Sequence, residues 1–166
     1  MGMIACYQMA TAEQIGMLQG MDAEDLFETV EELQEDADVL DIDKMWDGLH
    51  FLLTSASAAE PIKNNALSEA IVGKDVFFEE EDADFIAYTM PEHVKEVVKA
   101  LETFDIVKAI EQYDPKQFAE AGIYPNIWMY EDRESIREEL LTVFREMTAF
   151  YKKVAEQNMG ILVSIY

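Results

Sequence analysis

Two short apolar runs, one at each end of the chain, constrain the fold more than any other feature. Residues 3–9 read Met-Ile-Ala-Cys-Tyr-Gln-Met, and residues 161–166 read Ile-Leu-Val-Ser-Ile-Tyr. Short apolar runs bounded by turn residues are typical of buried strands. The second run is almost wholly apolar, which is typical of a strand in the middle of a sheet. The sequence therefore predicts a small sheet in which the strands from the two chain ends pair with each other.

Most of the chain between these runs has the periodicity of amphipathic helices. Over residues 22–35, a helix capped by Asp22 is predicted to bury Leu26, Phe27, Val30 and Leu33. A third helix is expected to begin at Asp41 or Asp43 and to reach Leu53. The longest helix is predicted over residues 132–157, with one apolar stripe made by Ile136, Leu140, Val143, Phe144, Met147, Tyr151 and Val154. Capping residues indicate further helix starts at Thr11, Asn65, Thr89, Asp105 and Asp114.

A hairpin is predicted next to these helices. Residues 76–78 and 85–88 are strand-like and flank an acidic turn at residues 79–82. The 166 residues contain no internal repeat or linker, and this length is typical of one domain. We therefore expect one helix-rich α+β domain over residues 1–166, built around a small sheet that includes the N- and C-terminal strands.

Composition favours a reducing compartment. The only cysteine is Cys6, so the chain has no partner for an intramolecular disulfide. No basic segment precedes an apolar run, and no stretch approaches the roughly 20 apolar residues that span a bilayer. We expect a cytoplasmic protein without a membrane anchor. No zinc-binding spacing is present, and neither a metal nor another cofactor is expected.

Charge is the most unusual property of the chain as a whole. The formal net charge is −23, from 35 acidic against 12 basic residues. Such a charge repels nucleic-acid phosphates and anionic lipids, which argues against direct binding to either. No Lys or Arg occurs before Lys44, and the polar face of the helix predicted over residues 22–35 carries Glu24, Glu28, Glu31, Glu32 and Glu35. This face and the acidic segment over residues 79–84 are interpreted either as solvated surfaces or as surfaces that recognise a basic protein partner.

The densest group of polar residues lies in the predicted third helix. Asp43, Asp47, His50 and Thr54 recur at steps of four, three and four, which places them along one ridge beside Trp46. A carboxylate next to an imidazole raises the pKa of the imidazole and fixes its tautomer, as a general base or a metal ligand requires.

A structural interpretation of the same ridge remains open. Asp41 or Asp43 would then cap the helix, Trp46 would fill the core, and Asp47 with His50 would hold the following loop. That loop also offers Lys63 and Asn64 next to a predicted helix start, where a small anion is one interpretation and an ordinary solvated turn is the other.

Several of these segments resemble the YfbM-like family of bacterial proteins. The resemblance is carried by residues 43–50, Asp-Lys-Met-Trp-Asp-Gly-Leu-His, by Pro61 and Asn64 ahead of Leu67, and by the turn Gly122-Ile123-Tyr124-Pro125. It spans nearly the whole chain. The family has no established function, so the resemblance implies a fold type and a bacterial cytoplasmic setting but no catalytic residues.

Two classes of function follow. The first is a non-enzymatic binding module, such as an inhibitor or an immunity-type protein, whose acidic surface meets a basic protein. The second is a small enzyme or ligand-binding protein with a site around Trp46, Asp47 and His50. The sequence favours the first class because it contains no recognisable nucleophile motif, phosphate-binding loop or metal-binding motif. It does not indicate the oligomeric state.

We expect Trp46→Ala to lower the free energy of unfolding by about 3 kcal/mol or more, because it deletes a large buried aromatic side chain. Denaturant melts measure this loss. A loss below about 1 kcal/mol would mean that Trp46 is exposed and serves as a platform for a ligand.

Overall fold

The apolar ends of the chain pair in the middle of one antiparallel sheet. The structure is a computed structural model that describes residues 2–79 and 85–166. Strand β1 (Ala5–Ala10) pairs with β5 (Gly160–Ile165) from Ala5 opposite Ile165 to Ala10 opposite Gly160. The sheet order is β2-β1-β5-β4-β3, with β2 (Val39–Asp41), β3 (Asp75–Val76) and β4 (Phe85–Thr89). The predicted pairing of the two terminal strands is confirmed.

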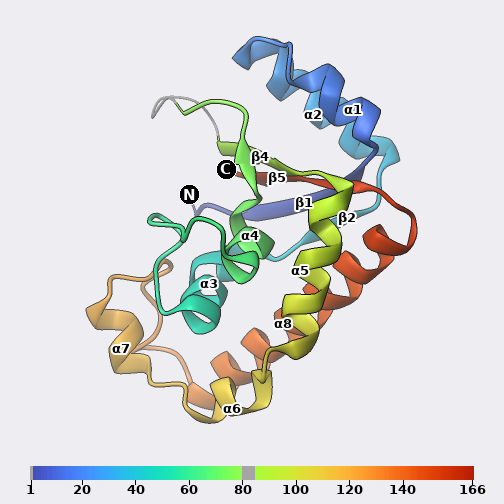
Figure 1. Ribbon diagram of the computed structural model, residues 1–166. Helices are drawn as coiled ribbons and strands as arrows, with labels where there is room; N and C mark the ends of the chain where they lie inside the picture. Colours follow the sequence, from blue (N-terminus) through green and yellow to red (C-terminus); the bar gives the residue numbers. More distant parts are fainter. Residues whose placement is uncertain (1, 80–84) are drawn as a thin grey trace.

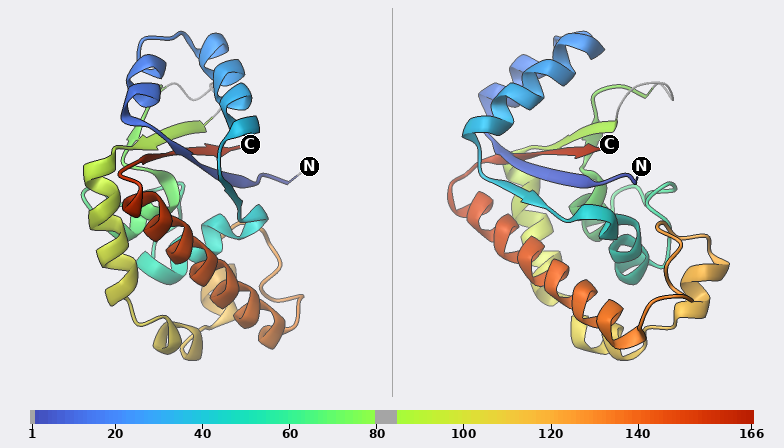
Figure 2. Two further views of the ribbon diagram at one scale, coloured as in Figure 1. Left: turned by 90° about the vertical axis from the view of Figure 1, so that its right-hand side faces the viewer. Right: turned by 180° about the vertical axis from the view of Figure 1, so that it is seen from behind.

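Helices cover both faces of this sheet, which gives the α+β architecture expected from the sequence (Figure 1). One face packs against α3 (Trp46–Thr54), α4 (Ala66–Val72), α5 (Pro91–Thr103) and α8 (Arg133–Glu156) around the larger core. The other face packs against α1 (Ala12–Leu18) and α2 (Ala23–Asp36) around a smaller core. The two short helices α6 (Ile106–Glu111) and α7 (Pro115–Glu120) lie at the end of the molecule farthest from α2 (Figure 2). No helix in the described ranges is long and apolar enough to cross a membrane.

Local capping explains where most helices begin. Thr11 and Gln14 form a reciprocal capping box at α1, as predicted. Asp22, Asn65, Asp105, Asp114 and Asp132 each accept a hydrogen bond from a backbone amide in the first turn of the following helix. These contacts join residues two or three positions apart, so the sequence alone contains the information for them.

Three details differ from the prediction. Thr89 does not cap α5: its hydroxyl oxygen accepts the Lys74 amide, because Thr89 is buried at the end of β4, and Met90 takes the N-cap position. The third helix begins at Trp46, after a 3₁₀ turn over Asp43–Met45 in which Asp43 has a φ of 51°. Strand β2 was not predicted, because three residues are too few to show a periodicity.

The predicted hairpin is present as the antiparallel pair β3 and β4. Most of its acidic turn falls within residues 80–84, outside the described residues.

Two buried tyrosines fix the C-terminal end of α4. Tyr7 of β1 donates a hydrogen bond of 2.6 Å to the Ile71 carbonyl, and Tyr151 of α8 donates one of 2.7 Å to the Ala70 carbonyl. Burial raises the pKa of both hydroxyls, so both remain protonated donors. Carbonyl groups at a helix end lack partners within the helix, and these bonds satisfy two of them. Helix α4 is thereby held against both the sheet and α8, which fixes one wall of the region described next.

Candidate functional site

Asp47 lies in the first turn of α3, and its carboxylate connects three segments of the chain. It is 4% exposed. Its Oδ1 accepts hydrogen bonds from the Ser57 hydroxyl at 3.0 Å and the Ala58 amide at 2.7 Å, and its Oδ2 accepts one from the Tyr124 amide at 2.9 Å. A buried carboxylate is costly unless such donors surround it. Asp47 therefore ties α3 to the loop over residues 55–65 and to the turn around Tyr124.

His50 is fully buried one turn further along α3, and both ring nitrogens have partners. Nδ1 lies 2.6 Å from the Ala56 carbonyl oxygen, which only accepts, so Nδ1 carries the proton. Nε2 lies 2.8 Å from the Ser68 hydroxyl oxygen, which also accepts the Ile62 amide at 3.0 Å. In the neutral imidazole Nε2 is an acceptor, so Ser68 donates to it. The ring thus connects both ends of the 55–65 loop to α4.

The expected effect of Asp47 on His50 is corrected by this geometry. The carboxylate makes its hydrogen bonds to Ser57, Ala58 and Tyr124, and none to the imidazole. Burial lowers the pKa of His50 below its ordinary value of 6.5, and the Ala56 carbonyl and the charge of Asp47 oppose this shift more weakly. Desolvation penalises the charged form, so the imidazole is neutral at pH 7.

Ser68 and His50 have the hydrogen-bond distance of a nucleophile and its base, but not the access that such a pair requires. Ser68 is 0% exposed, and its oxygen already accepts the Ile62 amide. The arrangement favours a structural role for this pair.

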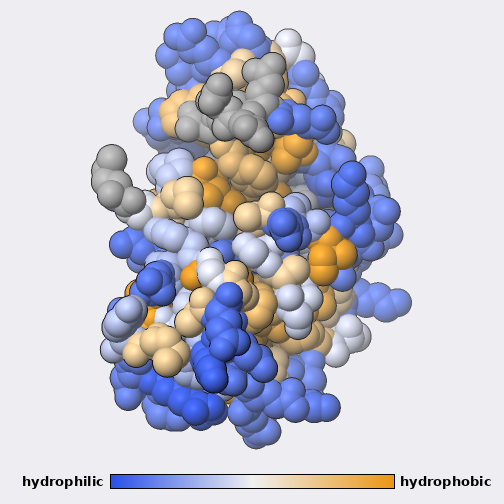
Figure 3. Space-filling model, turned by 90° about the vertical axis from the view of Figure 1, so that its left-hand side faces the viewer, coloured by the Kyte–Doolittle hydropathy of each residue, from blue (hydrophilic) through white to orange (hydrophobic). Residues whose placement is uncertain are grey.

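Trp46 contributes to a different surface. It is 7% exposed, donates its indole N–H to the Met3 carbonyl at 3.1 Å and stacks on Tyr124. With Val72, Phe85 and other apolar residues it lines an open cavity of about 380 Å³, which Asp47 and His50 do not line. Figure 3 shows apolar side chains exposed in the middle of the face on the left-hand side of Figure 1, with hydrophilic side chains above and below.

The remaining ridge residues separate from one another. Asp43 is exposed, and its backbone amide donates a hydrogen bond to the Asp41 carboxylate. Because Asp43 lies in the 3₁₀ turn before α3, the helical spacing that placed it on the ridge does not apply. Thr54 donates to the His50 carbonyl and accepts the Ala56 amide. Ser55 ends α3 in the left-handed conformation, with a φ of 62°. Thr54 and Ser55 therefore shape the start of the loop.

Lys63 and Asn64 are exposed and line a cavity of about 560 Å³ together with the ion pair between Lys74 and Glu69. The helix start beside them is already satisfied, because the Asn65 side chain accepts the Leu67 and Ser68 amides. The geometry thus favours the interpretation of this segment as a turn. No group of His, Cys, Asp or Glu suited to a metal ion occurs within residues 2–79 and 85–166.

The glutamates of α2 form a continuous exposed face. Glu24, Glu28, Glu31, Glu32 and Glu35 are all exposed. None of them forms an ion pair with a residue that the structure describes. Beside the C-terminal half of α2 lies a groove of about 460 Å³ whose lining includes Glu32, Asp36 and Asp38. The second acidic segment considered in the sequence, residues 79–84, lies almost wholly outside the described residues.

Ser57, Ser68 and Tyr124 complete the network around Asp47 and His50. Sequence reasoning did not assign them to it, because Ser68 and Tyr124 are 18 and 77 residues away from their partners and only the fold brings them together.

Fold and site together define an α+β protein whose central polar network is closed to solvent. The chain belongs to the family described as Domain of unknown function (DUF1877), which matches residues 1–164. It is 28% identical to Protein YfbM of Escherichia coli strain K12 over 166 residues, which cover 99% of each chain. It is also similar to the crystal structure of YfbM from Escherichia coli, described as a protein of unknown function, with a TM-score of 0.77, 26% identity and coverage of 98% of this chain and 99% of that one.

We expect His50 to make stability depend on pH. Its pKa is lower in the folded protein than in the unfolded chain, so its contribution is complete above about pH 6.5 and is lost as the pH falls below that value. Between pH 7.5 and pH 5.5 the wild type should lose up to about 1 kcal/mol more than His50→Gln in urea melts.

His93→Gln provides the control, because it removes the other histidine of the sequence, which is half-buried on α5 and contacts Glu96 rather than the network around Asp47. This variant keeps His50 and should keep the additional loss that His50 causes. Equal pH slopes for wild type and His50→Gln would contradict the interpretation of His50 as a buried neutral group.

Proposed function

We propose that this protein is a non-enzymatic binding protein that recognises a basic protein partner through the acidic face of α2. The observation that supports this proposal is a row of five exposed glutamates, none of which forms an ion pair within the described part of the chain: Glu24, Glu28, Glu31, Glu32 and Glu35. Like charges at helix spacing repel one another, so a cationic partner relieves a repulsion that the free protein carries. The net charge of −23 adds a long-range attraction that speeds the encounter.

The use of the central polar groups within the fold supports a binding role over catalysis. Both oxygens of the Asp47 carboxylate and both nitrogens of the His50 imidazole have hydrogen-bond partners within the protein. Both side chains are also nearly inaccessible to a substrate. The lone, buried Cys6 agrees with a cytoplasmic setting, where thiols stay reduced.

A small apolar ligand is the second candidate. The cavity beside Trp46 is lined almost wholly by apolar side chains, as ligand pockets often are. In that case the ligand quenches or shifts Trp46 fluorescence, whereas a partner bound at α2 does not. We rank this candidate second because the described residues that line the cavity provide no convergent set of charged side chains to give specificity.

The proposed function predicts an association rate that depends on salt. A partner captured from native bacterial lysate should be basic, and its association should slow as the salt concentration rises, because charges more than about 8 Å apart are screened at physiological ionic strength. Glu28→Lys with Glu32→Lys should lower the association rate more than it raises the dissociation rate, since exposed interface charges act mainly on the encounter. Binding kinetics across a salt series measure both rates.

The matched control is Glu111→Lys with Glu138→Lys, which changes the net charge equally. Glu111 is the last residue of α6, Arg137 beside Glu138 donates to its carbonyl, and α6 lies at the opposite end of the molecule from α2 (Figure 1). This control should slow association much less. Two results would contradict recognition by α2. One is a neutral or acidic partner whose association rate does not change with salt concentration, and the other is an equal decrease of the association rate in the two double variants.

A further inference from the structure

The groove beside α2 combines carboxylates with an apolar lining. Its acidic residues are Glu32 and Asp36, one helical turn apart on α2, and Asp38 just beyond the helix. Its larger apolar residues are Met9 of β1, Leu33 of α2 and Met159 in the turn between α8 and β5. Ala37 and the neutral polar residues Thr11, Gln14, Thr29 and Gln157 complete the lining. Met9 is buried, Leu33 and Met159 are half-buried, and the three acidic residues are exposed. The groove therefore has apolar side chains in its more buried part and carboxylates at its exposed rim.

This combination matches one kind of side chain. Lysine and arginine carry an aliphatic stem with a cationic end, and they bury the stem against apolar surface while the charged end stays near water or a carboxylate. A metal ion would not use the apolar lining, and a neutral apolar side chain would not use the carboxylates. The volume of about 460 Å³ is ample for one such side chain.

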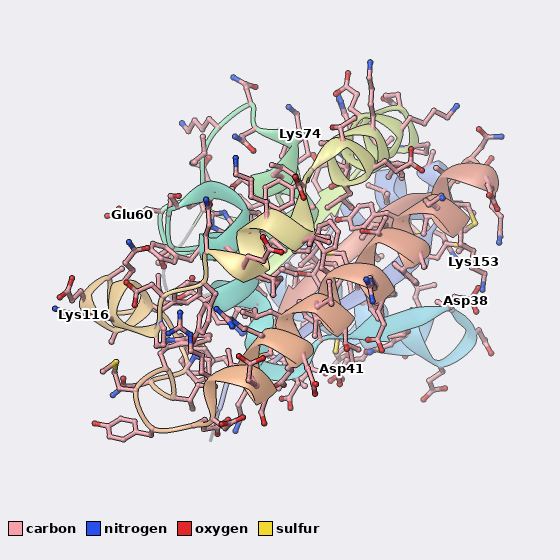
Figure 4. All side chains as sticks on the ribbon, turned by 90° about the horizontal axis from the view of Figure 1, so that it is seen from below. Asp38, Asp41, Glu60, Lys74, Lys116 and Lys153 are labelled. Carbon is pink, nitrogen blue, oxygen red and sulfur yellow. The ribbon has the colours of Figure 1, made fainter. Side chains whose placement is uncertain are left out.

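A cation of the protein itself already sits at this rim. The Lys153 ammonium of α8 lies 2.8 Å from Asp38 Oδ2, and Figure 4 shows the two side chains next to each other at the end of the molecule opposite Lys116. Both are about half exposed, so the ion pair can open. Glu32 and Asp36 have no ion-pair partner within the described part of the chain. The groove thus binds one ammonium weakly and leaves two carboxylates free.

We infer that this groove receives a single lysine or arginine side chain of the partner, in competition with Lys153. The inference rests on the proposed function, since it names the contact through which the acidic face would hold a basic segment. The stem of the incoming side chain packs on Met9, Leu33 and Met159. Its charged end pairs with Glu32 and Asp36, and with Asp38 once Lys153 has moved away.

The test uses a hexa-arginine peptide and a hexa-lysine peptide as probes, with isothermal titration at low salt. Lys153→Ala should bind them about two- to fivefold more tightly than Lys152→Ala. The two variants remove the same charge from adjacent positions, but Lys152 pairs with Glu102 of α5 rather than with the groove. Equal affinities for the two variants would overturn the competition with Lys153.

A second measurement locates the contact. The methyl NMR signals of Met9 and Met159 should shift on addition of either peptide, and the shift should disappear in Glu32→Gln with Asp36→Asn. The control Glu24→Gln with Glu28→Gln removes the same charge from the other half of α2 and should keep the shift. If both double variants weaken binding equally and the methyl signals do not shift, the proposed contact in the groove is wrong, but the proposed recognition by the acidic face of α2 is not contradicted. If neither variant weakens binding, the proposed function fails as well.

Discussion

The arrangement around α3 depends on one buried carboxylate. Asp47 accepts hydrogen bonds from Ser57, Ala58 and Tyr124, and so joins a helix to two segments that have no strand or long helix to fix them. A charge in this place would destabilise the fold without these donors, and the segments would lack a fixed path without the charge. Nearby, Gly48 allows α3 to approach the Trp128 ring so closely that any side chain at this position would collide with it. The hydrogen bonds to Asp47 thus explain why a charged residue lies among the inward positions of α3, beside the neutral His50 and the apolar Leu49 and Leu53.

This dependence also supports the proposal that the function resides elsewhere on the molecule. A catalytic site needs polar groups with free bonding capacity that a substrate can reach. Around α3 that capacity is taken up by the chain's own loops, and His50 is neutral because burial lowers its pKa. The exposed carboxylates of α2 are in the opposite situation, since their charge has no partner within the residues that the structure describes. This contrast between the two sets of carboxylates is the basis of the proposed binding role.

The sequence predicted those features that nearby residues determine. The capping box of Thr11 and Gln14 and the apolar stripe of α8 follow from local spacing, and the structure confirms both. The pairing of the terminal strands joins opposite ends of the chain; it was predicted from their apolar content, and it is also confirmed. Thr89 was wrongly predicted to cap α5. Its hydroxyl oxygen accepts the backbone amide of Lys74 across the hairpin, and residues near Thr89 in the sequence do not indicate this contact. Asp43 left the predicted ridge because its positive φ interrupts the helix. The contact of His50 with Ala56 agrees with the structural interpretation of the ridge, in which His50 holds the following loop. Its second partner was not predictable, because Ser68 reaches the imidazole only through the packing of α4 on α3.

The most direct test of this account is hydrogen exchange at the Ala58 and Tyr124 amides in Asp47→Asn. This variant keeps the shape of the side chain but replaces one acceptor oxygen with an amide nitrogen that donates. If the carboxylate holds both segments, at least one of these amides should exchange about tenfold faster or more, as expected when a hydrogen bond to a charged group is lost. The amides that pair β1 with β5 should accelerate less than these two, because they exchange only when the whole sheet opens. Unchanged exchange at both Ala58 and Tyr124 would contradict the account and reopen the possibility that Asp47 is kept for a ligand.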